Sequence, residues 1–285
     1  MKYFSKRLLK SFAIFSIFSP VHFVKGAEAV SQSAYKLTSL WNVPITNSMV
    51  TGWVVSLMLI VCVQIIIKGK AQLIPNKGQL VLEVMVSGLK DILEPITGKS
   101  ILPHAFPLLI GLFSFILIHN WSGLLPGVGT FGWVDSKGHL IYFFRPSNSD
   151  LNTTLALSLV SMIAWGYFVL RYEGLRSFMS HLFGNKANRK EVPFLIYAFL
   201  FFVFILVGGI ECISILFRLV SLSFRLYGNV FGGESLLSAM QGLCKYILPV
   251  PFYFLEILIG AIQAFVFTLL VAVYIGLVCN HEEAH

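Results

Sequence analysis

The stretch ILIGAIQAFVFTLLVAVYIGLVC, residues 257–279, contains 23 consecutive residues without a single Asp, Glu, Lys or Arg. About 20 such residues are enough for a helix to span the roughly 30 Å hydrocarbon core of a bilayer. Charge-free runs of similar length recur at 49–67, 105–134, 151–170 and 192–210. The sequence therefore predicts an all-α polytopic membrane protein.

The composition supports this class and excludes others. Of 285 residues, 56% are hydrophobic and 12% are charged, which is about half the charge of an ordinary soluble domain. The net charge of +8 does not indicate nucleic-acid binding, because the basic residues lie between apolar runs and leave no soluble basic module. The four cysteines are scattered singly, which predicts small buried residues rather than a disulfide framework or a metal site.

Five membrane crossings and one helix at the membrane surface are predicted within a single membrane domain, residues 30–285. Residues 78–96 are too charged to cross, and Glu83 and Lys90 fall on the opposite helical side from Met85 and Leu89, so this segment is predicted to be amphipathic and interfacial. The five predicted spans are about 47–67, 103–125, 149–170, 192–244 and 249–279.

The termini and loops predict an orientation. Residues 1–29 have a basic front, a short apolar stretch and small residues at their end. This pattern is typical of a secretory signal peptide, with a retained N-terminal extension at the membrane surface as the alternative. The connections 68–102 and 171–191 hold five Lys and Arg each, whereas the glycine-rich segment 126–148 holds two, one of them Arg145. The positive-inside rule therefore places both connections in the cytoplasm, and 126–148 and the N-terminus outside. We expect 126–148 to be an exposed loop.

The segment 192–244 is too long for one upright crossing. Its 53 residues contain no obvious polar loop and would make a helix of about 80 Å. Either the chain breaks near Gly208–Gly209 and crosses twice, or one helix runs steeply tilted within the membrane.

Polar residues line this segment at helical spacing. Arg218, Ser221, Arg225 and Asn229 are three or four residues apart and share a face, and Glu211 lies seven residues before Arg218. A charge at the bilayer centre costs roughly 2.5–3.5 kcal/mol on insertion scales. Such residues could simply join helices together, but two arginines and two glutamates in one apolar region exceed what packing requires. We therefore predict a functional site.

Glu234 is the second of these glutamates, and a further acid, Glu256, lies in the last predicted span. Glu234 is nine residues after Arg225, about half a helical turn out of phase, so the two need not form an ion pair. Glu256 and Gln263 are seven residues apart and share a face of the last predicted span. A single intramembrane acid can be a satisfied polar group. Two acids on separate helices are more typical of a proton relay, because a carboxyl group removed from water holds its proton more readily.

Several stretches resemble one known family. They are HNWSGLLPG at 119–127, PSNSDLNTTLALSL at 146–159, VSLSFRLYGNVFGGESLL at 220–237 and PVPFYFLEILIGAIQAFVFTLLVAVYIGL at 249–277. Together they resemble, in order and over about residues 47–279, subunit a of the F-type ATP synthases, the membrane proton channel of that complex.

The resemblance implies roles for individual residues. Arg225 matches the essential stator arginine that faces the ring of c subunits. Glu234 and Glu256 match the acidic pair of the half-channel open to the outside. Asn229 and Gln263 match polar residues near the arginine.

The cytoplasmic half-channel and accessory positions follow in the same way. Glu211 is similar to the acidic residue of that half-channel, and Arg218 stands where relatives commonly carry lysine. Asp150, Asn152 and Ser221 are implied as accessory residues.

The resemblance also implies the wider setting. The last two helices are expected to be long, tilted and hairpin-like against the c-ring, with a cytoplasmic C-terminus. The implied function is that of a proton-translocating stator subunit, which couples proton flow to ring rotation and ATP synthesis without a catalytic site, cofactor or metal of its own. The implied partners are the c-ring, the peripheral-stalk b subunits, the remaining F1Fo subunits and lipid in an energy-transducing membrane, such as a bacterial inner membrane. A stand-alone ion-coupled secondary transporter is the alternative.

Three histidine-containing features complete the prediction. HEEAH at 281–285 matches the zinc-protease pattern HExxH, but it offers no further ligand, and a solvated acidic tail is expected. His104 and His119 lie near span ends, where we expect interfacial positions, with a role in proton access as the alternative.

Overall fold

The structure, a computed structural model, describes residues 34–40, 43–67, 77–125, 128, 132–134, 140–142, 144–183, 194–243 and 247–279. The predicted signal peptide and the HEEAH stretch lie outside these residues. The described part is dominated by helices, which confirms an all-α polytopic membrane protein. Five helices are long and apolar enough to cross a membrane: Asn47–Ile65, Leu102–Ser122, Leu151–Tyr172, Phe202–Leu243 and Pro249–Leu277.

Helices α2 (Asn47–Ile67), α4 (Leu102–Ser122) and α5 (Leu151–Tyr172) begin and end within three residues of the predicted spans. The amphipathic helix is α3 (Lys77–Thr97). Helix α5 starts where it does because Asp150 accepts a hydrogen bond from the backbone N–H of Asn152 at 3.1 Å. A carboxylate at this position satisfies one of the free N–H groups of the first turn.

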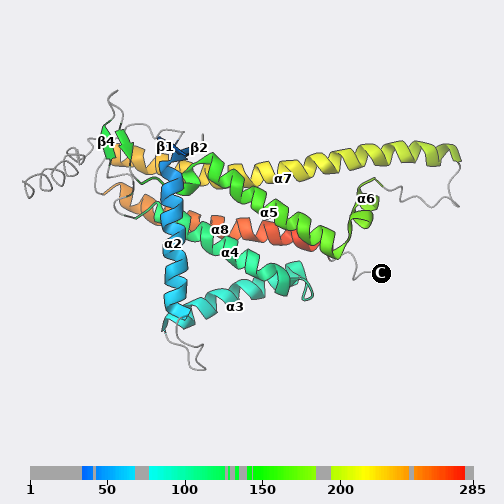
Figure 1. Cartoon of the computed structure of the whole chain (residues 1–285), viewed down its shortest axis with the longest axis horizontal. Helices are drawn as coiled ribbons and strands as arrows, with labels where there is room; N and C mark the ends of the chain where they lie inside the picture. Colours follow the sequence, from blue (N-terminus) through cyan, green and yellow to red (C-terminus); the bar gives the residue numbers. More distant parts are fainter. Residues whose placement is uncertain are drawn as a thin grey trace, which may run out of the picture.

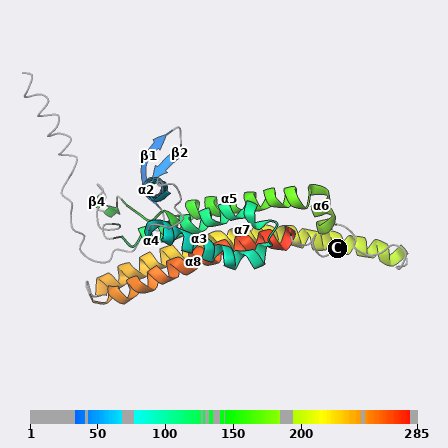
Figure 2. The same ribbon diagram turned by 90° about the horizontal axis from the view of Figure 1, so that it is seen from below.

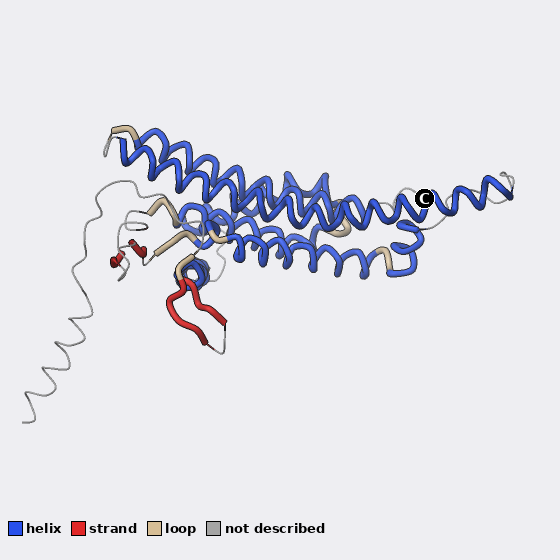
Figure 3. The backbone as a smooth tube through the Cα atoms, turned by 90° about the horizontal axis from the view of Figure 1, so that it is seen from above, coloured by secondary structure: helices blue, strands red, loops and turns tan. Residues whose placement is uncertain are grey.

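Helix α7 (Phe194–Leu243) is a single unbroken helix of 50 residues, about 75 Å long. The predicted alternative of a break at Gly208–Gly209 is therefore wrong. Glycine costs only about 1 kcal/mol in a helix interior, and here it is flanked by long apolar runs. Helix α8 (Pro249–Cys279) returns antiparallel beside α7, and the two lie side by side in Figures 2 and 3.

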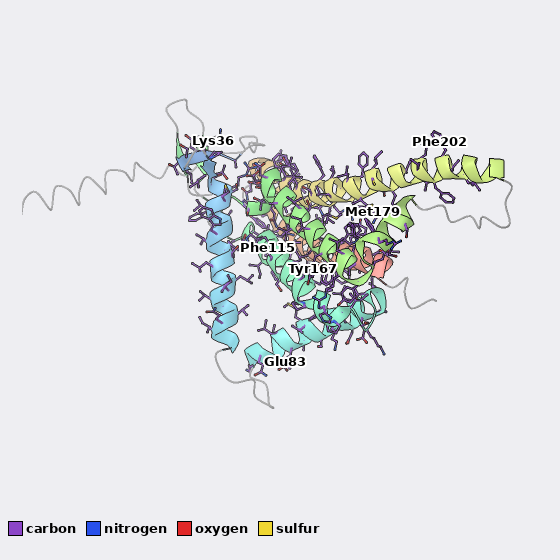
Figure 4. The ribbon with its side chains drawn as sticks, turned by 45° about the vertical axis from the view of Figure 1, so that its right-hand side comes forward. Lys36, Glu83, Phe115, Tyr167, Met179 and Phe202 are labelled. Carbon is purple, nitrogen blue, oxygen red and sulfur yellow. The ribbon has the colours of Figure 1, made fainter. Side chains whose placement is uncertain are left out.

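Helix α2 runs across the direction of this hairpin (Figure 1) and is seen end-on in Figure 3. At one end it carries the antiparallel strands β1 (Lys36–Leu40) and β2 (Val43–Thr46). At the other end it approaches α3. Figure 4 shows Lys36 and Glu83 at these opposite ends. With 21 residues, α2 is about 32 Å long, which matches the thickness of the hydrocarbon core.

The core lies where α4, α5, α7 and α8 meet. Lipid tails are as apolar as leucine, so these contacts stabilise the fold mainly through van der Waals packing. Gly276 of α8 allows one close approach, because a Cβ at this position would meet the backbone oxygen of Ile96 at the end of α3. Fully buried side chains include Leu109, Ile116, Leu222, Leu226, Phe267 and Ile275.

One predicted loop contains a helix. Within the basic connection 171–191 lies α6 (Leu175–Phe183), whose Phe178 packs edge-on against Trp165 of α5 with ring centroids 6.1 Å apart. The chain turns from α5 into α6 at Gly174, which has φ = 81°, a conformation that favours glycine.

The prediction of an exposed loop over 126–148 is wrong at its C-terminal end. Strands β4 (Gly132–Val134) and β5 (Leu140–Tyr142) form a short hairpin. Arg145 is then only 6% exposed, just before the 3-10 turn η1 (Ser147–Ser149). The chain folds inward here because η1 packs against α2, α4 and α7. A glycine-rich segment without periodicity gave no sign of this burial.

Candidate functional site

Most of the predicted site residues lie on the α7–α8 hairpin, and two of them, Asn229 and Arg218, contact side chains of α8. Asn229 of α7 donates a hydrogen bond from Nδ2 to Oε1 of Gln263 on α8, at 2.5 Å. Farther along, the guanidinium carbon of Arg218 lies 5.1 Å from the centre of the Tyr274 ring, within the range of a cation–π interaction. The hairpin therefore brings together pairs that the sequence could place only on separate helices.

Arg225 lies between these two contacts but points elsewhere. Its neighbours Leu222 and Leu226 are buried, at 1% and 0% exposure, while Arg225 itself is exposed. Within the described part of the chain, its guanidinium has no hydrogen bond or ion pair. An arginine on an apolar helix without an internal partner is costly in a membrane, so this face is suited to a partner outside the chain.

The predicted polar face is divided between two directions. Arg218 and Asn229 turn toward α8 and are half-buried. Ser221 and Arg225 are exposed. Gly228 and Gly232 extend this exposed face of α7. Both are exposed, and a Cβ at either position would have open space around it. We call Ser221, Arg225, Gly228 and Gly232 the arginine stripe.

An ion pair precedes Arg225 along α7. Arg218 Nη2 donates a hydrogen bond to Oε1 of Glu211 at 3.1 Å. The side chains are 23% and 46% exposed, respectively, so the pair is reachable from outside the helix bundle. Glu211 lies 14 residues before Arg225, about 21 Å along the helix axis.

A second charged pair follows Arg225. The Glu234 carboxylate lies 3.9 Å from Nε of Arg145, and Oε2 is buried without a hydrogen-bond partner among the described residues. Glu234 does not pair with Arg225, in agreement with their helical phase. Arg145 was missed from the sequence, because it lies in a nonperiodic segment and its partner is far away in the chain.

Glu256 of α8 meets α7 at Gly233, directly next to Glu234. The carboxylate of Glu256 occupies the space where a side chain at position 233 would stand. Helix α4 holds this part of α8 in position. Asn120 Nδ2 donates a hydrogen bond to the backbone oxygen of Gly260, and Trp121 Nε1 donates one to that of Ile257, both at 3.1 Å. Glu256 therefore packs against the residue that precedes Glu234 in α7.

Asp150 and Asn152 lie at the start of α5 rather than on the hairpin. Asp150 is buried and accepts a hydrogen bond from Ser48 Oγ at 2.8 Å. Asn152 is exposed and donates from Nδ2 to Asp150 Oδ1 at 3.2 Å. These contacts cap α5 and attach it to α2, which gives the pair a structural role.

The two histidines differ from each other. His119 is completely buried inside the helix bundle, and its depth in the membrane stays a prediction. Its Nδ1 lies 2.8 Å from the backbone oxygen of Phe115, and its ring stacks on the Phe115 ring. His104 is exposed, and its ring contacts Tyr172 edge-on at 6.2 Å. In the described residues, no group of three His, Cys, Asp or Glu side chains could hold a metal ion.

Comparison with known proteins gives a consistent result. Residues 49–276 match the family model described as ATP synthase A chain. The chain is 32% identical over 234 residues to ATP synthase subunit a of Moorella thermoacetica, with 82% of this chain and 91% of that protein covered. It is 31% identical over 232 residues to ATP synthase subunit a of Syntrophobacter fumaroxidans, with 81% and 83% covered. The corresponding protein of Aliarcobacter butzleri is 32% identical over 216 residues, with 75% and 82% covered. With its five apolar helices and its charged hairpin, the chain belongs to the ATP synthase A chain family.

Proposed function

We propose that this chain is the proton-translocating stator subunit of an F-type ATP synthase and that Arg225 separates two half-channels for protons. The observation that carries the proposal is the exposed, internally unpartnered Arg225 on an apolar helix. An acidic site precedes it and another follows it along α7. Glu234 lies nine residues after Arg225, about 14 Å along the helix axis, and Glu211 about 21 Å before it.

The partner of Arg225 is the carboxylate of a c subunit. A ring carboxylate that travels through lipid must be protonated, because an ionised one is heavily penalised there. Beside a guanidinium, which stays positive under all ordinary conditions, the ionised form is favoured and the proton leaves. The same fixed charge opposes direct passage of a proton between the half-channels. Proton flow is thereby coupled to ring rotation.

The outer half-channel contains Glu234 and Glu256, and the cytoplasmic one contains Glu211 and Arg218. Two buried polar atoms near the middle of the hairpin, Glu234 Oε2 and Gln263 Nε2, lack hydrogen-bond partners among the described residues. Buried polar atoms are normally satisfied. We infer that water or a passing ring carboxylate satisfies these atoms in the working complex.

The arrangement of helices supports a tilted hairpin. If α2 crosses the membrane upright, then α7 and α8, which run across it (Figure 1), lie closer to the membrane plane. This also explains how a helix of about 75 Å fits within a hydrocarbon core of about 30 Å. The arginine stripe then faces the c-ring, where its small residues allow a neighbouring helix to approach closely. The peripheral-stalk b subunits and the remaining F1Fo subunits are the further proposed partners, with the N-terminus outside and the C-terminus cytoplasmic.

The test is replacement of Arg225 in the assembled complex. Arg225→Ala is expected to abolish proton-driven ATP synthesis in membrane vesicles while the subunit still co-purifies with the c-ring. Arg225→Lys should be a poor substitute, because lysine is a compact charge that can lose its proton when desolvated. Arg176→Gln, at an exposed position of α6, is the control and should synthesise ATP normally. Coupled synthesis at the normal rate by Arg225→Ala would refute the proposal.

A further inference from the structure

Arg145 is held in place by contacts on its own side of the site. Its backbone N–H donates to Thr51 Oγ1 of α2 at 3.4 Å, and its Nε donates to Ser149 Oγ at 2.9 Å. Ser149 Oγ in turn donates to the backbone oxygen of Pro146 at 2.9 Å. With a side-chain exposure of 6%, the guanidinium has little freedom. Contacts with α2 and η1 therefore help to hold its charge in place.

Its contact with Glu234 is close but incomplete. A strong charge-assisted hydrogen bond has N···O distances of about 2.7–2.9 Å, whereas Nε of Arg145 lies 3.9 Å from Oε2 of Glu234. Oε2 is buried and accepts no hydrogen bond from the described residues. The arginine thus attracts the carboxylate while Oε2 accepts no hydrogen bond from the described residues.

This geometry suits an acid that must both gain and lose a proton. A tight bidentate pair would hold Glu234 in its ionised form, and a buried carboxylate without any cation would stay protonated. The Glu256 carboxylate rests against Gly233, the residue that precedes Glu234, and is a candidate for the next proton acceptor. A loose pair with a fixed cation lies between the two extremes.

We propose that Arg145 is a positioning residue for proton relay through Glu234, an inference that rests on the proposed function. Ionised Glu234 takes a proton from water of the outer half-channel and becomes a neutral acid. It then passes that proton to the next carboxylate, Glu256 or that of the ring, and is ionised again. Arg145 keeps all its protons throughout, because a guanidinium is not deprotonated in proteins. It keeps the emptied carboxylate at the relay position.

The experiment measures proton-driven ATP synthesis and passive proton conduction through F1-stripped vesicles, both normalised to the amount of assembled complex. Arg145→Gln should lower both rates by up to about a hundredfold, the loss expected when a reacting group is misplaced by about 1 Å. Arg145→Lys should be less defective than Arg145→Gln, because the Glu234 carboxylate beside it favours the protonated ammonium group. Arg225 lacks such a fixed carboxylate within the described part of the chain, which is why lysine is expected to serve poorly there. If the guanidinium group had only a structural role, the rates of Arg145→Lys would be lowered as much as those of Arg145→Gln. Arg176→Gln is the matched control.

The double variant Arg145→Gln/Glu234→Gln separates the possible outcomes. Its rates should equal those of Glu234→Gln alone, because Arg145 acts through Glu234. Where Arg145→Gln fails to assemble, the double variant should assemble, since it also removes the buried Glu234 charge that the single variant leaves behind. Four results would each overturn the inference. They are normal rates in Arg145→Gln, equal defects in Arg145→Lys and Arg145→Gln, additive losses of rate in the double variant, and failure of the double variant to assemble. Those results leave the proposed function standing, because that depends on the Arg225 variants.

Discussion

Gly233 offers the sharpest test of the geometry between the two outer acids. In Gly233→Ala, the new Cβ would collide with the Glu256 carboxylate. That carboxylate is the end of a flexible side chain, so it can retreat by about 1 Å while the helices stay where they are. Alanine also stabilises the interior of α7 by roughly 0.5–1 kcal/mol relative to glycine. The complex should therefore remain within about 1 kcal/mol of wild-type stability.

The functional effect should be much larger. A misplacement of about 1 Å at a reacting group can cost about a hundredfold in rate. Gly233→Ala should thus assemble normally and yet conduct protons up to about a hundredfold more slowly. The assay compares passive proton conduction in F1-stripped vesicles with the thermal stability of the purified complex.

Two matched glycine variants make the comparison decisive. At Gly276 a Cβ would meet the backbone oxygen of Ile96, which cannot move aside. Gly276→Ala should therefore destabilise the complex by about 1–3 kcal/mol, the usual cost of overpacking. At Gly111 of α4, a Cβ would have no neighbouring atom within 4 Å, so Gly111→Ala should be normal in both assays. Wild-type conduction by a fully assembled Gly233→Ala complex would refute the placement of Glu256 against α7.

Two further predictions concern the ends of the hairpin and of α5. Asp150→Ala should destabilise the complex by about 1–3 kcal/mol, because it removes a helix cap and the acceptor of the buried Ser48 hydroxyl. Asp150→Asn keeps one acceptor oxygen, which can still cap α5, but its amide NH2 group cannot accept from Ser48, so the loss of stability should be smaller. Thermal unfolding that ranks the two variants equally would contradict the capping role. Tyr274→Phe should keep ATP synthesis near normal, whereas Tyr274→Leu should weaken the position of Arg218 by about 0.5–2 kcal/mol through loss of the ring face. Equal synthesis rates in the Phe and Leu variants would argue against the cation–π contact.

The sequence by itself determined the class of the protein and most of its helix boundaries. Charge-free runs the length of a bilayer leave few alternatives to helices, since every backbone polar group must be satisfied within the segment. Helical phase also predicted correctly that Glu234 need not pair with Arg225. These properties are local, depending on composition and on a repeat of 3.6 residues.

Only the tertiary structure decided which groups meet. Three contacts join segments that are far apart in the chain. Arg145 lies beside Glu234, Glu256 packs against Gly233, and Asn229 forms a hydrogen bond with Gln263. Such contacts depend on how α2, α4 and η1 hold the hairpin, and periodicity within one helix carries no information about its neighbours. The continuity of α7 was likewise open in the sequence, because two glycines can mark a break, yet they weaken a helix too little to break it when the flanking turns are apolar.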